Sequence, residues 1–486
     1  MTSLFAHRRT GGATFSTYGA SLALVTALAL GLSAGVAPAP VWAQNAQVQT
    51  KQYDDGGVYV GTFRGGLQHG EGTYTLPNGY EYTGQWEDGE IKGLGTARFP
   101  NGSVYEGEFA KGKPNGIGKI TFSDGGTFEG EWGDGVINGQ GIAIYANGVR
   151  YEGAFLNAKH HGKGVMQSPG GYEYKGDWIE GRKEGQGIIT YPDGAAYDGA
   201  ILAGKRHGDG KLTLPDGLVY VGTWKDGQID GTGTLTQPNG DIYEGDLVGG
   251  RREGMGKVTY ANGDIYEGDF LDDRRHGQGT FTGADGYVYT GSWVAGQIEG
   301  QGQVAYPDGS VYEGDFRADL SDGRGKITYP DGSSYEGAWV AGVIEGEGRA
   351  VFANGIVYEG MFQNALNHGP GVMTYPDGYR YEGNWENGLR NGDGKATYAD
   401  GTVYTGAFLD GQRHGDGEIV MPDGFRYVGA WDRGEISGRG TAYYANGDIY
   451  EGDFKDGKRQ GSGTMTYASG QEAAGEWENG ALSDGS

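Results

Sequence analysis

From Tyr59 onward, large apolar residues, glycines and polar residues recur with a period of 23 residues. An aromatic residue opens each unit, at Tyr59, Tyr82 and every 23rd residue as far as Tyr450, with Phe128 as the one Phe among them. Eighteen complete units follow one another without an insertion, and a nineteenth begins at Ala473. A fixed period of this length indicates a repeat array in which each unit stacks on the next. We number the positions within a unit from 1 to 23, with Tyr59 at position 1.

Within each unit the apolar residues alternate as expected of a β-hairpin. Positions 1, 3 and 5 carry an aromatic residue, Gly and mostly Trp or Phe, so they share one face of a strand. Positions 14, 16 and 18 predict a second strand, as in Gly187, Ile189 and Tyr191. Asp-Gly or Asn-Gly at positions 20 and 21 is a strong hairpin signal, because Gly accepts a positive φ. The stretch between the two strands, including positions 9–11, is expected to form a Gly-bearing loop.

The glycines follow the same period. Gly fills positions 3, 12, 14 and 21 in all eighteen units, and these four columns hold 72 of the chain's 102 glycines. Glycine inside a strand is unfavourable by propensity. Its recurrence at positions 3 and 14 therefore predicts that a neighbour's aromatic ring lies flat over the backbone there. The absence of a Gly-X-Y period excludes collagen, and 34 Tyr, 16 Phe and 10 Trp are too many aromatic residues for a disordered coil.

The pattern predicts an all-β protein, with an elongated, single-layer, twisted antiparallel sheet of stacked 23-residue hairpins. One unit buries too little apolar area to offset the entropy of ordering it, so stability is collective along the array. Two strands per unit, about 4.8 Å apart, give a ribbon about 170 Å long. Residues 59–472 are expected to form the array, residues 44–58 a linker and N-terminal half-hairpin cap, and residues 473–486 a degenerate C-terminal cap.

The pattern Tyr-Glu-Gly-x-Trp-x-x-Gly-x-x-x-Gly-x-Gly, present at 335–348 and 381–394, closely resembles the MORN (membrane occupation and recognition nexus) repeat. The resemblance covers the chain from about Lys51 to its C-terminus. It implies a ribbon of hairpins with a scaffold or recognition role, often near membranes, and frequent self-association, for instance as a homodimer. In related proteins that catalyse, an attached domain supplies the activity. No segment outside the repeats resembles such a domain, so we do not expect an enzyme.

Residues 1–43 differ from the rest of the chain. They carry Arg8 and Arg9, no acidic residue, an Ala/Leu-rich run over 20–37, and Val41-Trp42-Ala43 before Gln44. This is the pattern of a bacterial secretory signal peptide, which would form a short helix. We expect export to the periplasm or cell envelope of a Gram-negative type of cell, or secretion. An uncleaved segment would instead anchor the protein in the membrane.

Position 5 adds a second-order period of 46 residues, because Trp alternates there with another apolar residue. The alternation slips once, near residues 243–288, where two blocks of nine units meet. The slip is either a duplication boundary without mechanical effect or a local change of twist that bends the ribbon or forms a dimer contact. The Trp residues of this column are expected to be structural: Trp86, Trp132, Trp178, Trp224, Trp293, Trp339, Trp385, Trp431 and Trp477.

Positions 9–11 follow the same alternation. Six Trp units carry Ile at position 10, whereas the other units tend to be basic and hold six of the eight His of the chain at position 11. In one interpretation, pairs of units pack together and the basic residues neutralise nearby acids. In the other, the residues form a cationic edge that docks an anionic polymer, lipid headgroups or an acidic partner, with His adding pH sensitivity. The candidate interaction edge comprises His69, His161, Lys205, Arg206, His207, Arg251, Arg252, Arg274, Arg275, His276, His368, Arg413, His414, Lys458 and Arg459.

The rest of the sequence mainly excludes classes of functional site. There is no Cys, no pair of His at zinc-ligand spacing and no nucleophile or phosphate-loop motif, so we expect no catalytic residue, no metal and no cofactor. A net charge of −26 argues against nucleic acid. No small-molecule substrate is expected. The favoured function is a non-catalytic scaffold or protein-interaction module of the cell envelope, bound to a protein partner or to itself. The alternative is recognition of membrane lipid headgroups or an envelope glycan through the basic, His-bearing edge.

Overall fold

The computed structural model describes residues 47–483, which contain 39 β-strands and no helix. The predicted signal segment 1–43 lies outside these residues. Seven-residue strands cover position 23 of one unit to position 6 of the next, and nine-residue strands cover positions 9–17. The first strands are β1 (Gln49–Gln52), β2 (Val58–Arg64) and β3 (Leu67–Thr75). The β2–β3 pair recurs every 23 residues as far as β36 (Ile449–Lys455) and β37 (Lys458–Thr466), followed by β38 (Glu472–Glu478) and β39 (Ala481–Leu482).

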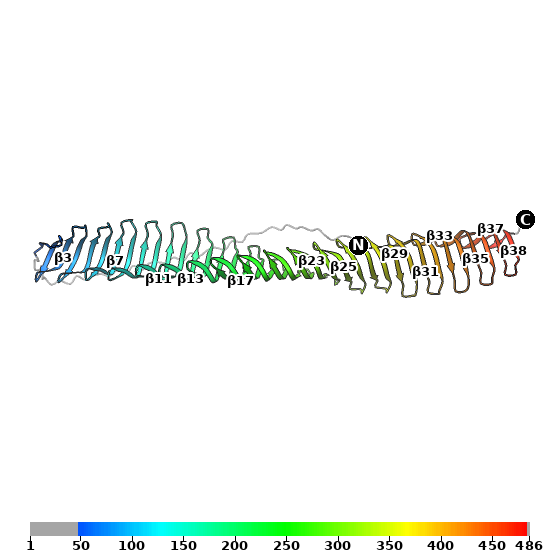
Figure 1. Ribbon diagram of the computed structural model, residues 1–486, viewed down its shortest axis with the longest axis horizontal. Helices are drawn as coiled ribbons and strands as arrows, with labels where there is room; N and C mark the ends of the chain where they lie inside the picture. Colours follow the sequence, from blue (N-terminus) through cyan, green and yellow to red (C-terminus); the bar gives the residue numbers. More distant parts are fainter. Residues whose placement is uncertain (1–46, 484–486) are drawn as a thin grey trace, which may run out of the picture.

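Each strand pairs antiparallel with the strands before and after it in the sequence, so the whole chain is one open meander sheet. Figure 1 shows the result as a long ribbon. Its hairpins lie broadside at the blue and orange ends and edge-on in the green middle, so the ribbon winds about its long axis. The predicted all-β, single-sheet antiparallel ribbon is confirmed. Strand register is the same on both sides of the alternation slip, where Tyr243 faces Val258 and Tyr266 faces Phe281.

Two kinds of turn alternate along the two edges of the ribbon. The long turn spans positions 18–22, where the N–H of Leu76 donates to the carbonyl oxygen of Tyr80 (2.8 Å) and the N–H of Gly79 to that of Leu76 (3.1 Å). The tight turn has only two residues, at positions 7 and 8. Both take positive φ, 49° at Asp88 and 90° at Gly89, as the twist of a two-residue hairpin requires.

The tight turn corrects the prediction of a Gly-bearing loop over positions 9–11. These positions are already strand, because the chain reverses within two residues and pairs again at once, for example Arg64 with Leu67. The extra length is absorbed by a bulge instead. Gly61 faces Gly72 and Phe63 faces Gln68, so three residues of β3 lie opposite one residue of β2. Gly70, inside this bulge, has a φ of +80°.

The tyrosine at position 1 packs on the glycines at positions 3 and 14. A Cβ added to Gly61 or Gly72 would overlap the phenol ring of Tyr59, which is fully buried. The Tyr59 hydroxyl donates a hydrogen bond to the carbonyl oxygen of Thr62 (3.0 Å). The predicted ring-over-glycine packing is therefore present, but the ring belongs to the same unit and not to a neighbour. A Tyr side chain at position 1 is long enough to reach both strands of its own hairpin.

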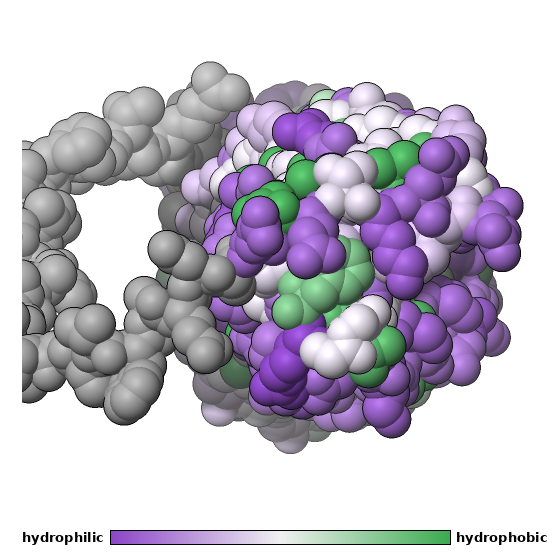
Figure 2. Space-filling view, turned by 90° about the vertical axis from the view of Figure 1, so that its left-hand side faces the viewer, coloured by the Kyte–Doolittle hydropathy of each residue, from purple (hydrophilic) through white to green (hydrophobic). Residues whose placement is uncertain are grey.

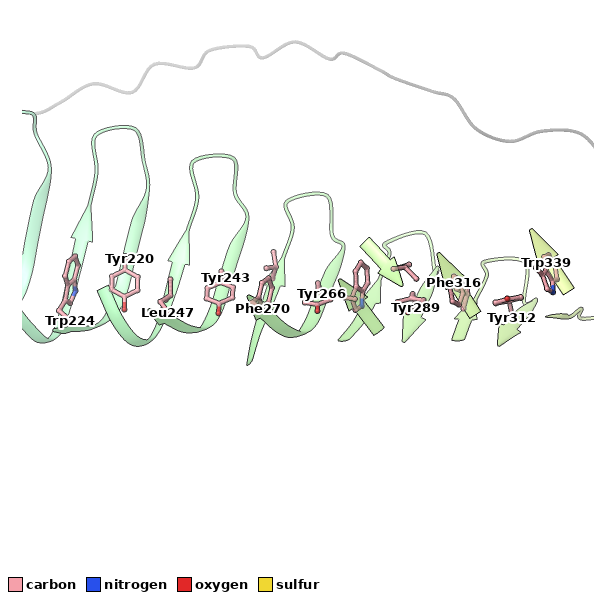
Figure 3. Packing of buried hydrophobic residues seen from close by; sticks show 14 of the residues in the cluster. Tyr220, Trp224, Tyr243, Leu247, Tyr266, Phe270, Tyr289, Tyr312, Phe316 and Trp339 are labelled. Carbon is pink, nitrogen blue, oxygen red and sulfur yellow. The ribbon is translucent and has the colours of Figure 1, made fainter. Parts of the chain in front are cut away.

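The buried side chains at positions 1 and 5 of successive units form one continuous row, aromatic except at Ile201 and Leu247, and part of it is drawn in Figure 3. The Tyr59 ring lies edge-to-face against Phe63 of its own unit and Trp86 of the next, with ring centroids 5.1 Å apart in both pairs. The Trp86 indole N–H also donates back to the carbonyl oxygen of Gly72 (3.2 Å). All nine predicted structural Trp residues donate to a position-14 carbonyl of the preceding unit. Each unit that carries Trp at position 5 is thereby hydrogen-bonded to the unit before it.

A single-layer sheet buries this row because partly buried aromatic residues of the long turns, such as Tyr80, Phe99 and Tyr172, pack against it. Seen from the end of the ribbon that carries β3, the cross-section is rounded, with polar residues around most of the rim (Figure 2). We call the sheet face that carries the rings the aromatic face, and the opposite one the open face.

This architecture predicts a rod in solution. With 39 strands at a spacing of about 4.8 Å, the sheet is about 180 Å long, and a rod of that length has a radius of gyration of about 50 Å. A compact protein of 486 residues would have about 23 Å. Small-angle X-ray scattering measures the difference directly, and a value close to 23 Å would contradict the ribbon.

Candidate interaction surface

The predicted edge residues occupy the first three residues of the nine-residue strands. In β15 (Lys205–Thr213), Lys205, Arg206 and His207 stand at positions 9, 10 and 11, directly after the tight turn. Position 10 faces position 5 across the hairpin and therefore lies on the aromatic face, whereas position 9 faces position 6 and lies on the open face. We call the edge formed by positions 6–9 the tight-turn edge. The three columns differ in burial and contacts, so each is described separately.

Arginines at position 10 lie over the aromatic row. The Cζ of Arg206 is 4.1 Å from the ring centroid of Trp224, and that of Arg413 is 4.3 Å from Trp431. Arg206 also donates a hydrogen bond to the carbonyl oxygen of Gly227 in the next tight turn (2.8 Å). The other position-10 arginines of the predicted edge also lie over ring faces: Arg252, Arg275 and Arg459. Each of these half-buried cations thus links its own unit to the next.

His160 belongs to this column and was missed by the sequence analysis. Its imidazole stacks on the Tyr151 ring, with centroids 3.7 Å apart and planes 19° apart, and its Nε2 lies 2.7 Å from the Tyr145 hydroxyl. Burial lowers the pKa of His160 to about 4. Its position in the repeat could have identified it, because other units carry a side chain that covers an aromatic ring at position 10.

Three of the six histidines at position 11 accept a hydrogen bond from the next tight turn. The backbone N–H of Asp88, the first residue of the next tight turn, donates to Nδ1 of His69 (3.4 Å). His207 and His276 accept in the same way from Asp226 and Ala295. His161 and His368 each keep a buried Nδ1 without a partner among the described residues, and His414 Nδ1 lies 3.4 Å from the Asp432 carboxylate.

Many acidic residues are engaged in the same manner. In the unit that starts at Tyr174, Asp177 accepts the N–H of Gln186 (3.0 Å), which the bulge leaves free. Glu184, at position 11, accepts the N–H of Ala203 in the next tight turn (2.9 Å). Asp193 accepts an N–H within its own long turn. Part of the net negative charge therefore caps backbone donors, and it is not a free acidic surface.

Among the described residues, most cations at position 9 have no such internal role; Arg251, which pairs with Asp272, is an exception. Lys205 pairs across the tight turn with Leu202 at position 6, and both side chains are exposed, Leu202 by 47%. The predicted edge residues Lys205, Arg251, Arg274 and Lys458 all belong to this column. Lys159 and Arg182 belong to the same column but were not among the predicted edge residues, and neither were the aliphatic partners at position 6. They were not predicted because a loop over positions 9–11 does not place positions 6 and 9 opposite each other.

The described residues give no sign of a metal or membrane-spanning site. Within residues 47–483 no group of three or more His, Asp or Glu converges to hold a metal ion. The same range contains no helix long and apolar enough to cross a membrane.

Comparison with known families decides what kind of array this is. The MORN repeat model matches eighteen consecutive segments, from residues 59–79 to residues 450–472. The chain belongs to the MORN repeat family. MORN repeats are in general non-catalytic modules that interact with proteins or membranes.

Similarity to individual known proteins is low. No curated protein matches the chain. Among solved structures, the TCP10 domain of Danio rerio CPAP is 17% identical and matches 50% of this chain and 93% of its own, with a TM-score of 0.17. The TCP domain of Drosophila melanogaster SAS-4, solved with a proline-rich motif of Ana2, is 15% identical over 41% of this chain and 90% of its own, with a TM-score of 0.18. Virginiamycin B lyase of Staphylococcus aureus is 11% identical over 61% and 97%, with a TM-score of 0.11. These scores are too low for any conclusion about this chain.

Adjacent cations on opposite faces should behave differently on substitution. Arg206→Gln removes a cation–π contact and a charge-assisted hydrogen bond, so we expect the local opening free energy to fall by about 1–2 kcal/mol. Lys205→Gln should change it by less than about 0.5 kcal/mol. Hydrogen exchange of the segment 205–228 measures both. Equal changes in the opening free energy for the two variants would show that Arg206 does not stabilise the contact between neighbouring units.

The burial of His160 predicts a pH dependence. Its folded pKa of about 4 lies below the unfolded value of about 6.5, so folding favours the neutral ring. The stability that depends on this neutral ring is present above pH about 6.5 and is lost as the pH falls towards 4. His160→Phe keeps the ring stack without a proton. The wild type should therefore lose more stability than His160→Phe when denaturation midpoints at pH 7 and pH 4.5 are compared, and identical losses would contradict the assignment.

Proposed function

We propose that this MORN repeat protein is a non-catalytic scaffold of the cell envelope that binds another protein along its tight-turn edge. The observation that carries the proposal is a row of exposed aliphatic side chains on that edge. They stand at position 6 or position 9 in most units: Leu67, Val136, Leu156, Ile179, Leu202, Val248, Leu271, Val294, Leu320, Val340, Val343, Leu366, Leu389 and Leu409.

Single exposed aliphatic residues are ordinary on protein surfaces, whereas an aligned set usually marks an interaction site. Here the strand register aligns the set. Positions 6 and 9 face each other in every hairpin, and every hairpin is paired to the next, so equivalent positions of neighbouring units lie about 9.6 Å apart. Five of the eighteen units, for example the one with Glu87 and Glu90, lack an aliphatic residue of this set. Each side chain is about half exposed, so a large part of its surface is available to a partner. A series of similar side chains along one edge is what a scaffold offers to an elongated partner.

A second function is supported by the cations in the same row. Lys205 beside Leu202 and Arg182 beside Ile179 combine a positive head with an apolar side chain, a combination that also suits lipid headgroups or an acidic glycan. The net charge of −26 opposes adhesion to an anionic bilayer. We therefore place lipid or glycan recognition second. The location in the envelope rests on the signal-like segment 1–43.

Site-specific crosslinking in cells tests the main proposal. A photoreactive amino acid replaces Leu202 on the tight-turn edge or, as a matched control, Val221, which is 51% exposed on the open face. We expect a discrete protein adduct from position 202, recovered in the envelope fraction, and none from position 221. The proposal fails if neither position gives an adduct or if both give the same one.

A further inference from the structure

One stretch of the tight-turn edge differs from the rest, and the inference drawn from it rests on the proposed function. From β10 (Arg150–Leu156) to β21 (Arg274–Thr282), six consecutive tight turns each carry an exposed cation at position 6 or 9, and five of them pair it with an exposed aliphatic residue. We call this set the basic stretch. Its cross-turn pairs are Leu156–Lys159, Ile179–Arg182, Leu202–Lys205, Lys225–Gln228, Val248–Arg251 and Leu271–Arg274.

No other part of the described ribbon repeats this combination over consecutive units. The pairs Glu87–Glu90 and Asp432–Glu435 are acidic, and Glu386–Leu389 combines an aliphatic residue with an acid. The basic stretch is thus local to residues 156–274 within a chain of net charge −26.

Most of these cations are free to pair with a ligand. Arg251 forms an ion pair with Asp272 (2.8 Å), and the stacked Arg252 lies 3.4 Å from Asp273. Among the described residues, Lys159, Arg182, Lys205, Lys225 and Arg274 have no ion-pair partner. Two further acids stand in the same tight turns, Glu180 and Asp226. The free cations outnumber them, so this part of the edge attracts an anionic partner.

The distance between the cations of the basic stretch indicates the backbone conformation of that partner. Successive position-9 residues are separated by two strand spacings, about 9.6 Å, and five of the six cations stand in this column; Lys225, at position 6, lies one strand from Lys205. A polypeptide in the polyproline II conformation rises about 3.1 Å per residue with three residues per turn, so every third side chain returns to the same side after about 9.3 Å. A β-strand cannot match, because its side chains alternate with a period of two. An acid at every third residue would therefore meet the position-9 cation of each unit that has one, and an apolar residue beside it would meet the position-6 aliphatic side chain.

The shape of the edge favours a chain over a membrane. The ribbon winds about its long axis, most visibly through its green middle (Figure 1), so a flat bilayer could touch only part of the basic stretch at once. A single extended chain can follow the winding edge over all six units. The acidic remainder of the ribbon adds repulsion from an anionic leaflet.

We infer that the basic stretch binds an extended acidic segment of a partner protein, in polyproline II conformation, with an acidic residue at every third position next to an apolar one. Lys159, Arg182, Lys205 and Arg274 pair with its carboxylates, and the position-6 aliphatic residues contact its apolar side chains. Six units span about 48 Å between the first and last cation, the length of about 16 residues of such a chain.

The test uses the full-length protein and fluorescent peptides in an anisotropy titration. The probe is an 18-residue peptide of six Glu-Pro-Val triplets. Its controls are six Gln-Pro-Val triplets, which lack charge, and a Glu-Pro-Pro-Val repeat, which has a period of four. We expect saturable binding of the first peptide alone, weakened by salt because the contacts are exposed ion pairs. Equal binding of the Gln peptide or of the period-four peptide would overturn the inference.

Protein variants locate the site. The quadruple variant Lys159→Gln, Arg182→Gln, Lys205→Gln and Arg274→Gln should weaken binding of the Glu-Pro-Val peptide by about tenfold, since four exposed pairs together contribute about 1–2 kcal/mol. The matched control changes four exposed lysines of the open face to Gln, at Lys119, Lys175, Lys211 and Lys395, and should weaken binding less than about twofold. Equal loss in both variants would show that only net charge matters and would overturn the inference.

Two further readouts separate this inference from the proposed function. Vesicles containing anionic lipid are titrated in parallel, and binding to vesicles but not to the peptide would assign the basic stretch to a membrane. If no peptide binds while the crosslink from position 202 persists, the inference on the partner's chemistry fails and the proposed scaffold function stands. If the crosslink is absent as well, both fail.

Discussion

The structure depends on one repeated interaction, a tyrosine ring lying over two glycines of its own hairpin. Tyr197, for example, is fully buried above Gly199 and Gly210, where a Cβ on either glycine would overlap its ring. The ring joins the two strands of one hairpin, and its edge-to-face contact with Trp224 joins that hairpin to the next. This contact recurs in most units, and Ile201 and Leu247 take the place of the second ring in two of them, so a sheet one layer thick acquires a continuous apolar row and can reach the length of the whole array without a second layer.

The demands of this backbone explain how the polar residues are used. Tight turns and bulges leave N–H groups unpaired, and the side chains of Asp177, Glu184 and His69 accept them. Position-10 cations such as Arg206 cover the ring row and hold the following turn. The exposed side chains at positions 6 and 9 of the tight-turn edge are the ones that mostly take no part in these internal contacts. A surface of this kind, repeated at a fixed spacing, matches the general role of MORN repeats as interaction modules.

Much of the fold could be predicted from the sequence, because period, alternation and the glycine columns each reflect a local constraint. The single antiparallel sheet and the ring-over-glycine packing followed from Tyr59, Gly61 and Gly72. The tight turn could not be placed in the same way, since positions 7 and 8 vary between units, as in Lys111-Gly112 and Asn157-Ala158, whereas positions 20 and 21 are almost always Asn-Gly or Asp-Gly. That one misplacement put Lys205, Arg206 and His207 in a common loop. In the structure they separate into an exposed cation, a ring-covering cation and a hydrogen-bond acceptor, and such a division depends on strand register, which composition does not encode.

The central claim is that the tyrosine at position 1 and the glycine at position 14 require each other, and a double-mutant cycle on Tyr197 and Gly210 tests it most directly. Gly210→Ala alone should destabilise its hairpin by about 1–3 kcal/mol, because the added methyl group displaces the ring. In the Tyr197→Ala background the same substitution should cost almost nothing, so the coupling energy should equal most of the single-mutant effect. The free energies come from hydrogen exchange of the segment 196–213. Additive costs, with a coupling energy near zero, would contradict the account.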